Sequence, residues 1–260
     1  MTVPELFPDN RGVIVAIDHP LYMWPTRGLE DRGAVIRTVV DAGADGVIAT
    51  YGTLRDHADA FGDSKRILKL DTKALSVGEY QMGDHAVCWT LDDARRLGAH
   101  AVLTFVQVGL PDELPALVQA ARIAAECDRA GLPFLCEIMP IESPNYPDPF
   151  DPAAIAACAR AAAELGAHLV KTSIPNPAEE VAQAVAASGL PIFLAGGDPQ
   201  PTEDAFLDQI RAAVRGGAAG VAVGRNVWGG PDPAGMVAKL RAIVHGDLVG
   251  ATPGDLAASR

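Results

Sequence analysis

Residues 164–173 read ELGAHLVKTS. A helical, alanine-rich run reaches Gly166, an alanine follows, and the apolar stretch after it ends in a lysine, Lys171. The order of helix end, Gly-Ala and apolar stretch recurs, without the lysine, in three further segments, DAGADGVIAT (41–50), RLGAHAVLTF (96–105) and RGGAAGVAVG (215–224). Glycine just past a helix adopts the left-handed conformation without a steric penalty. The repeat therefore marks places where a helix ends and a strand begins.

Four more segments complete the series. AGLPFLCEI (130–138) and SGLPIFLAG (188–196) end a helix at glycine and open a strand with proline, and GVIVAID (12–18) and RILKLD (66–71) are further strand candidates. Proline is tolerated at the first residue of a strand, where its missing N–H costs little. Eight strands are thus predicted, and their expected starts are near residues 13, 46, 67, 101, 133, 168, 191 and 219.

The predicted strands are short and continuously apolar, which is typical of strands buried on both faces. Strands that alternate with helices form right-handed βαβ units. Eight such units in a chain of 260 residues predict a single (β/α)8 TIM barrel, with a doubly wound open sheet as the alternative. No linker or change of composition interrupts the pattern, so we expect one domain over residues 1–260.

Composition excludes several classes of partner. The formal net charge is −12, with 33 acidic and 21 basic residues, which disfavours nucleic acids and anionic membranes. No apolar run is long enough to span a bilayer, and the N-terminus lacks a signal-peptide pattern. The four cysteines form no CxxC pair and predict no disulfide framework. We expect a cytoplasmic protein that forms a homo-oligomer.

Active sites of such barrels form at the carboxyl ends of the strands. Polar residues at those ends include Asp18, Lys69, Glu137 and Lys171. A lysine in a barrel mouth is partly desolvated, which favours the neutral amine that attacks a carbonyl and forms a Schiff base. The alternative is that Lys171 only extends its ammonium group into solvent. Lys69, at the end of the third strand, is the rival nucleophile, or a cation that assists Lys171.

Asp18 ends the first strand. Its carboxylate could relay a proton or orient the hydroxyl of a carbinolamine, or it could cap the turn before Pro20. Metal chemistry is not indicated, because the six histidines show no paired spacing typical of metal ligands. They stand at positions 19, 57, 85, 100, 168 and 245. No cofactor is expected.

Glycines follow the seventh and eighth strands, in LAGGD (194–198) and VGRN (223–226). Loops after these two strands are the usual phosphate site of TIM barrels, because glycine lets backbone N–H groups approach an anion closely. We therefore expect Gly196, Gly197, Gly224 and Arg225 to bind phosphate, with ordinary turn glycines and a structural arginine as the alternative. The expected partner is a small phosphorylated carbonyl compound.

The runs LVKTS, IFLAGGD, TEDAFLDQI and GVAVGRNVW, over roughly residues 164–228, resemble the DhnA-type class I aldolases. That family includes archaeal class I fructose-1,6-bisphosphate aldolases and LsrF-like enzymes, and VAIDH and ILKLD also fit it. The resemblance implies that Lys171 is the Schiff-base lysine and Asp18 the active-site aspartate of the first strand. It also implies that the two glycine segments and Arg225 bind phosphate.

Two departures from the family pattern stand out. The bisphosphate aldolases carry Tyr-Pro after the fifth strand, where this chain has Met139-Pro140, and a thioether cannot transfer a proton. Glu137 shares the strand face of Met139 and is the first candidate to replace that tyrosine. Tyr146 and Glu142, in the proline-rich loop that follows, are further candidates. Asp198-Pro199 stands where the family often has a lysine, which weakens the case for a second phosphate.

The sequence thus predicts a metal-independent class I aldolase, a lyase that acts on a phosphorylated ketose or a dihydroxyacetone-phosphate-like donor. We expect poor cleavage of fructose 1,6-bisphosphate. An LsrF-like acyltransferase or a biosynthetic transaldolase or synthase on the same lysine is the second interpretation. A non-catalytic sugar-phosphate binder is the third.

Overall fold

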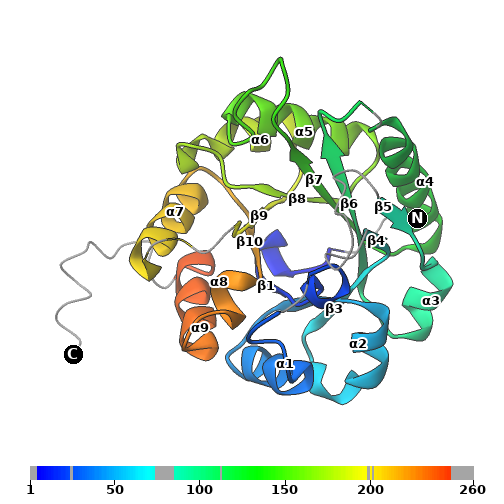
Figure 1. The fold of residues 1–260 in the computed structure, drawn as a ribbon, viewed down its shortest axis with the longest axis vertical. Coiled ribbons are helices and arrows are strands. Elements are labelled where there is room, and N and C mark those ends of the chain that lie inside the picture. Colours follow the sequence, from blue (N-terminus) through cyan, green and yellow to red (C-terminus); the bar gives the residue numbers. More distant parts are fainter. Residues whose placement is uncertain are drawn as a thin grey trace.

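The computed structural model describes residues 5–23, 26–73, 85–111, 113–197, 200 and 202–246. Eight parallel strands close into a barrel, and helices surround it (Figure 1). This confirms the predicted (β/α)8 barrel, and each strand begins within about two residues of its expected start. The barrel strands are β1 (Gly12–Ala16), β2 (Gly46–Ala49), β3 (Lys65–Lys69), β6 (Ala101–Val108), β7 (Phe134–Pro140), β8 (Leu169–Ser173), β9 (Ile192–Ala195) and β10 (Gly220–Val223).

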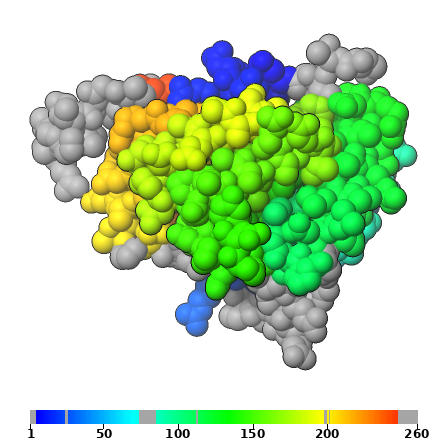
Figure 2. Space-filling view, turned by 90° about the horizontal axis from the view of Figure 1, so that it is seen from above, coloured from blue at the N-terminus to red at the C-terminus, as the bar shows by residue number. Residues whose placement is uncertain are grey.

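Helices pack around the outside of the barrel, and those coloured green to yellow, among them α5, α6 and α7, contribute to one continuous outer face in Figure 2. No helix among the described residues is both long and apolar enough to cross a membrane. The α-helices are α1 (Arg32–Asp41), α2 (Tyr51–Asp56), α3 (Leu91–Arg96), α4 (Leu114–Ala130), α5 (Pro152–Glu164), α6 (Val181–Ser188), α7 (Glu203–Arg215), α8 (Arg225–Trp228) and α9 (Pro233–Val244). Single 3-10 turns are η1 (Pro8–Asn10), η2 (His19–Leu21), η3 (Ala58–Phe61) and η4 (Ala178–Glu180).

The repeated Gly-Ala step is a Schellman motif, which joins helix to strand. The four repeat glycines have positive φ, and the N–H of the next alanine donates to the carbonyl five residues earlier. Ala167, for example, donates to the carbonyl of Ala162 at 3.0 Å. This hydrogen bond satisfies a carbonyl that the helix end would otherwise leave without a partner. The glycines are Gly43, Gly98, Gly166 and Gly217.

Inside the barrel, apolar side chains from alternate strand positions form a compact layer around Phe193. Leu6 and Phe7 close the amino end of the barrel, and the rings of Phe7 and Phe193 lie 5.7 Å apart. A larger apolar cluster fills the space between the strands and the surrounding helices. The amino end is therefore sealed, and only the carboxyl end of the barrel can admit a substrate.

A two-stranded antiparallel hairpin, β4 (Asp71–Lys73) and β5 (His85–Val87), follows β3 at the carboxyl end. The sequence does not predict this hairpin, because the three residues of β4 are polar and show no alternating apolar pattern. Within the hairpin, Asp71 pairs with Val87 and Lys73 with His85. The hairpin places these polar side chains beside the barrel mouth.

Candidate active site

Four charged side chains form one layer at the carboxyl end of the barrel interior. Each stands two positions beyond an inward-facing apolar residue of the same segment, and alternate residues of a strand face the same side. All four are buried, which is unusual for charged groups unless they are paired. The layer consists of Asp18, Lys69, Glu137 and Lys171.

Lys171 and Glu137 form a direct ion pair. They are register partners in the ladder between β8 and β7, and Nζ of Lys171 lies 2.7 Å from Oε1 of Glu137. Both side chains are nearly buried, with 6% and 11% of their surface exposed. A carboxylate at this distance can accept a proton from the ammonium group and leave the neutral amine that attacks carbonyls.

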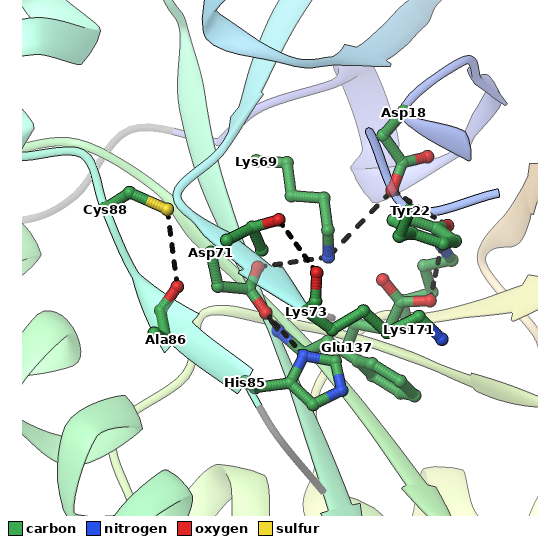
Figure 3. A network of polar contacts seen from close by, with 12 residues as sticks. Asp18, Tyr22, Lys69, Asp71, Lys73, His85, Ala86, Cys88, Glu137 and Lys171 are labelled. Carbon is green, nitrogen blue, oxygen red and sulfur yellow. Dashed lines mark hydrogen bonds and ion pairs between the residues drawn. The ribbon is translucent and has the colours of Figure 1, made fainter. Parts of the chain in front are cut away.

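Lys69 lies between two carboxylates, 3.0 Å from Asp71 and 3.9 Å from Asp18 (Figure 3). Burial alone would lower the pKa of Lys69, but the charges of Asp71 and Asp18 outweigh it and raise that pKa above its ordinary value. The amine of Lys69 therefore stays protonated and cannot attack a carbonyl. The two lysines of the layer also differ in access, because Lys171 lines the open cavity described below and Lys69 is not part of its lining.

Asp18 is held as a carboxylate. Burial would raise the pKa of Asp18, but His19, which is charged at the acidic pH where Asp18 titrates, and the cations Lys69 and Lys171 lower it below its ordinary value. Burial lowers the pKa of His19, so its imidazole is neutral near pH 7 and Lys69 is the permanent cation beside Asp18. Asp18 thus acts as an acceptor of hydrogen bonds at neutral pH.

Tyr22 is a site residue that the sequence analysis missed. Its hydroxyl donates a hydrogen bond to Oδ2 of Asp18 at 3.3 Å, and its ring lines the cavity described below. Burial and the charge of Asp18 raise the pKa of Tyr22 well above its ordinary value, so the hydroxyl stays protonated. The signal was the spacing of four residues in DHPLY, which puts Asp18 and Tyr22 on one face of a helical turn.

Asp71 links this layer to the hairpin. Its Oδ2 lies 3.2 Å from Nδ1 of His85 and accepts the N–H of Phe105 at 3.1 Å. The ring of His85 meets that of Phe105 edge to face, with centroids 4.9 Å apart. The pKa of Asp71 falls below its ordinary value, because Lys69 and His85 outweigh the effect of burial. Figure 3 shows the network from His85 through Asp71 and Lys69 to Asp18.

A cavity of about 690 Å³ opens above this layer, with Glu137 and Lys171 in its lining. On the β9 and β10 side, the corresponding inward positions carry the small residues Ala195, Ala222 and Gly224. The missing side-chain volume leaves room there for a substrate beside Lys171. The cavity is therefore asymmetric, with charged groups on one side and open space on the other.

The two glycine loops meet at the rim of this open side. Gly196, Gly197, Gly224 and Arg225 all line the cavity, and Nδ2 of Asn226 donates to the carbonyl of Gly196 at 3.0 Å. A Cβ on Gly224 would lie only 2.7 Å from the carbonyl oxygen of Ala16, so no larger residue fits there. Gly197 has a φ of +62°, and nothing would lie within 4 Å of a Cβ there. Its backbone therefore faces open space.

The structure thus brings together eight of the predicted site residues, since Asp18 and Lys69 lie beside the six that line the cavity. Tyr146 does not join them. It is 37% exposed, sits in a loop turn where its N–H donates to the carbonyl of Ser143 at 3.1 Å, and is not part of the cavity lining. Met139 does line the cavity, whereas Asp198-Pro199 lies outside the described residues.

The chain matches the family model of the DeoC/LacD family aldolases over residues 12–230. It belongs to this family. A relative from Streptomyces griseus, 2-amino-4,5-dihydroxy-6-oxo-7-(phosphonooxy)heptanoate synthase, is 33% identical over 91% of this chain and 85% of its own. A second relative is 2-amino-3,7-dideoxy-D-threo-hept-6-ulosonate synthase from Halobacterium salinarum. It is 35% identical over 92% of this chain and 88% of its own.

Solved structures agree with this assignment. An archaeal fructose 1,6-bisphosphate aldolase superposes with a TM-score of 0.84 at 28% identity, over 93% of this chain and 96% of its own. Another archaeal structure, also with a TM-score of 0.84 and 28% identity, covers 93% of this chain and 97% of its own, and its catalytic lysine is covalently bound to the carbinolamine intermediate. The resemblance to class I aldolases is thereby confirmed. The chain is a lyase of the Schiff-base-forming class of aldolases.

Proposed function

We propose that this aldolase joins a phosphorylated three-carbon ketone, held as a Schiff base on Lys171, to an aldehyde acceptor. The observation that carries the proposal is the buried pair of Lys171 and Glu137 in the wall of a cavity whose rim is lined by Gly197, Gly224 and Arg225. A nucleophile with its base and a cradle for an anion thus share one cavity. These are the two requirements for covalent catalysis on a ketone phosphate.

In the first step, Glu137 takes a proton from Lys171, and the neutral amine attacks the ketone carbon. A C–N bond forms, and the carbonyl oxygen becomes the hydroxyl of a carbinolamine. Return of the proton from Glu137 to this hydroxyl releases water and leaves an iminium ion. The iminium draws electrons from the neighbouring carbon, so it replaces a metal ion as the electron acceptor.

In the second step, a base removes a proton from the carbon next to the iminium, and the resulting enamine attacks the acceptor aldehyde. A carbon–carbon bond forms, and the aldehyde oxygen takes the proton that the base removed from carbon and becomes a hydroxyl. Glu137 is proposed to carry this proton, and the hydroxyl of Tyr22, which stays protonated, is the proposed hydrogen-bond donor to the developing oxyanion. Water then hydrolyses the iminium and frees Lys171.

The donor phosphate is proposed to bind at the rim formed by Gly196, Gly197, Gly224 and Arg225. Backbone N–H groups of glycine loops cradle anions, and an arginine adds a charge-assisted contact. The position also fits, because these loops follow the last two strands of the barrel. Binding the phosphate here places the ketone carbon next to Lys171 on the adjacent strand.

The name of the Streptomyces griseus relative supports this donor. Its product carries a ketone at carbon 6, a phosphate ester at carbon 7 and hydroxyl groups at carbons 4 and 5. An aldol bond joins the carbon next to the ketone to the carbon that carried the aldehyde, here carbons 5 and 4. Carbons 5–7 then derive from dihydroxyacetone phosphate, and carbons 1–4 from an acceptor that ends in a carboxylate.

Of the interpretations that the sequence left open, the relatives favour a biosynthetic synthase over a sugar-cleaving enzyme. Met139 points the same way, because the cavity lacks a tyrosine at this position for the proton transfer that fructose 1,6-bisphosphate cleavage requires. We further propose a cytoplasmic location. It would suit the free thiols of Cys88, Cys127, Cys136 and Cys158.

The test is to incubate the enzyme with dihydroxyacetone phosphate and a panel of aldehydes and to identify products by mass spectrometry. The proposal predicts adducts longer than the acceptor by the three donor carbons. It also predicts that cleavage of fructose 1,6-bisphosphate is slower than product formation by about 10²-fold or more, the usual loss when an acid–base group is missing. Efficient bisphosphate cleavage without any condensation product would contradict it.

A further inference from the structure

Lys73 is a cation in the cavity that the steps above do not use. It belongs to β4 of the hairpin and lines the cavity together with Lys171 and Arg225. Of the described charged residues in the lining, these three are cations, and only Glu137 is an anion, already paired with Lys171. A chain with a net charge of −12 thus presents a cationic cavity, which favours anionic substrates.

The barrel order places Lys73 away from the phosphate cradle. Strands follow one another as β1, β10, β9, β8, β7, β6, β3 and β2, so β3 is four strands from β9 and directly across the barrel. Gly196 and Gly197 follow β9, whereas Gly224 and Arg225 follow β10, which is three strands from β3 by way of β1 and β2. Lys73 follows β3 through the short β4. A substrate with its phosphate at β9 and its ketone carbon on Lys171 must therefore grow toward the β3 side.

The hairpin holds Lys73 at this position through several contacts. Lys73 is the register partner of His85, His85 pairs with Asp71, and Asp71 is tied to the backbone of Phe105. The ammonium group of Lys73 lies 4.7 Å from the centre of the Tyr22 ring. Tyr22 is the proposed donor to the oxygen of the acceptor aldehyde, so Lys73 lies next to the place where the acceptor is proposed to react.

We propose that Lys73 forms an anion subsite that binds a negatively charged group at the far end of the acceptor aldehyde. The inference rests on the proposed function, since it takes the donor to be bound through its phosphate at β9 and β10. The group recognised is a carboxylate or a phosphate, both of which an ammonium group binds. Lys73 thereby selects charged acceptors and supplies an anion site separate from the proposed phosphate cradle.

The test compares acceptors that differ only in charge. Succinic semialdehyde is paired with butanal, and glyceraldehyde 3-phosphate with glyceraldehyde, each at a saturating concentration of dihydroxyacetone phosphate. We expect Lys73→Met to lower kcat/KM for the preferred anionic acceptor by roughly tenfold to a hundredfold, the loss typical of a hydrogen bond to a charged group. The neutral acceptors should change by less than about twofold. The pair for which the wild type shows the larger preference for the charged acceptor identifies carboxylate or phosphate as the group that Lys73 binds.

Two variants serve as controls. Lys65→Met removes a lysine from the opposite end of the same segment, at the start of β3, and should leave every acceptor unchanged. Lys73→Arg keeps the charge and should restore most of the selectivity. Equal losses on charged and neutral acceptors in Lys73→Met would overturn the subsite, because they would mean that Lys73 only positions Tyr22.

Borohydride trapping separates this inference from the proposed function. The donor adduct on Lys171 should form equally in the wild type and in Lys73→Met. Absence of the adduct in the wild type would overturn the proposed function and the subsite with it. A normal adduct together with unchanged acceptor selectivity would overturn the subsite alone.

Discussion

Nζ of Lys171 lies 2.7 Å from Oε1 of Glu137, across the ladder between β8 and β7. Both residues extend from the interior layer of the barrel toward its open end, and both side chains are nearly buried. The proposed base thus stands on the strand adjacent to that of the proposed nucleophile.

Glu137→Gln keeps the size of the side chain and removes its ability to take a proton. We expect turnover to fall by about 10²–10⁴-fold, the usual contribution of a positioned acid–base group. Schiff-base trapping of the donor after long incubation should remain. Steady-state kinetics and borohydride trapping measure the two effects separately, and unimpaired turnover in Glu137→Gln would remove Glu137 from the mechanism.

Tyr22→Phe removes the hydroxyl that donates to Asp18 while keeping the ring. Because this hydroxyl is the proposed donor to the acceptor oxygen, we expect kcat to fall by about 10²-fold with little change in the donor adduct. Tyr51→Phe is a matched control, since the Tyr51 hydroxyl contacts Arg96 and does not line the cavity. Equal activity of the two variants would argue against a role for Tyr22.

Arg225→Ala tests the phosphate cradle. We expect donor binding to weaken by about 1.5–3 kcal/mol, the range for a hydrogen bond to a charged group. KM for dihydroxyacetone phosphate should rise accordingly, whereas unphosphorylated dihydroxyacetone should be almost unaffected. Arg211→Ala, which removes an arginine that pairs with Asp208 on α7, is the control. Similar losses on both donors would disprove the phosphate contact.

Asp71→Asn tests whether the buried cation Lys69 depends on its carboxylate partners. Loss of one partner leaves Asp18 3.9 Å from Lys69, so we expect a loss of about 3 kcal/mol in the free energy of unfolding at pH 7. Urea unfolding measures this difference. A loss below about 1 kcal/mol would mean that Asp18 and solvent suffice to stabilise Lys69.

The same variant has a predicted pH dependence. The folded-state pKa of Asp71 lies below the ordinary value of 3.8, so its contribution to stability is complete above pH 3.8. That contribution is lost as the pH falls through the folded-state pKa. The difference in unfolding free energy between wild type and Asp71→Asn should therefore be constant from pH 7 to about 5 and shrink below 3.8. A difference that grows with acidity would contradict the assignment.

The sequence predicted the barrel because its signals are local. The Gly-Ala step needs only the residues of one helix end, and the inward alternation of Leu169 and Lys171 needs only one strand. The sequence indicates the contact between Glu137 and Lys171 less directly, because this contact depends on the register between β7 and β8. These two residues could be selected only because both end apolar runs.

Features set by contacts across the mouth could not be predicted in this way. The protonation of Lys69 depends on Asp71, which the hairpin and Phe105 hold in place. The hairpin itself could not be predicted, because β4 has no apolar pattern typical of a strand. The four-residue spacing of Asp18 and Tyr22 allows a contact between them, but only the structure shows the Tyr22 hydroxyl beside Asp18. Tyr146 is a predicted site residue that lies outside the cavity. Its position in the loop after β7 did not indicate the direction in which that loop turns.

The most direct test of the account is to identify the residue that forms the Schiff base. The enzyme is incubated with dihydroxyacetone phosphate in buffer containing EDTA, reduced with borohydride, digested and analysed by mass spectrometry, with Lys171→Met as the control. We predict a single reduced adduct on Lys171, absent from Lys171→Met, and undiminished activity in EDTA. An adduct on Lys69, or activity that EDTA abolishes and a divalent metal restores, would contradict it.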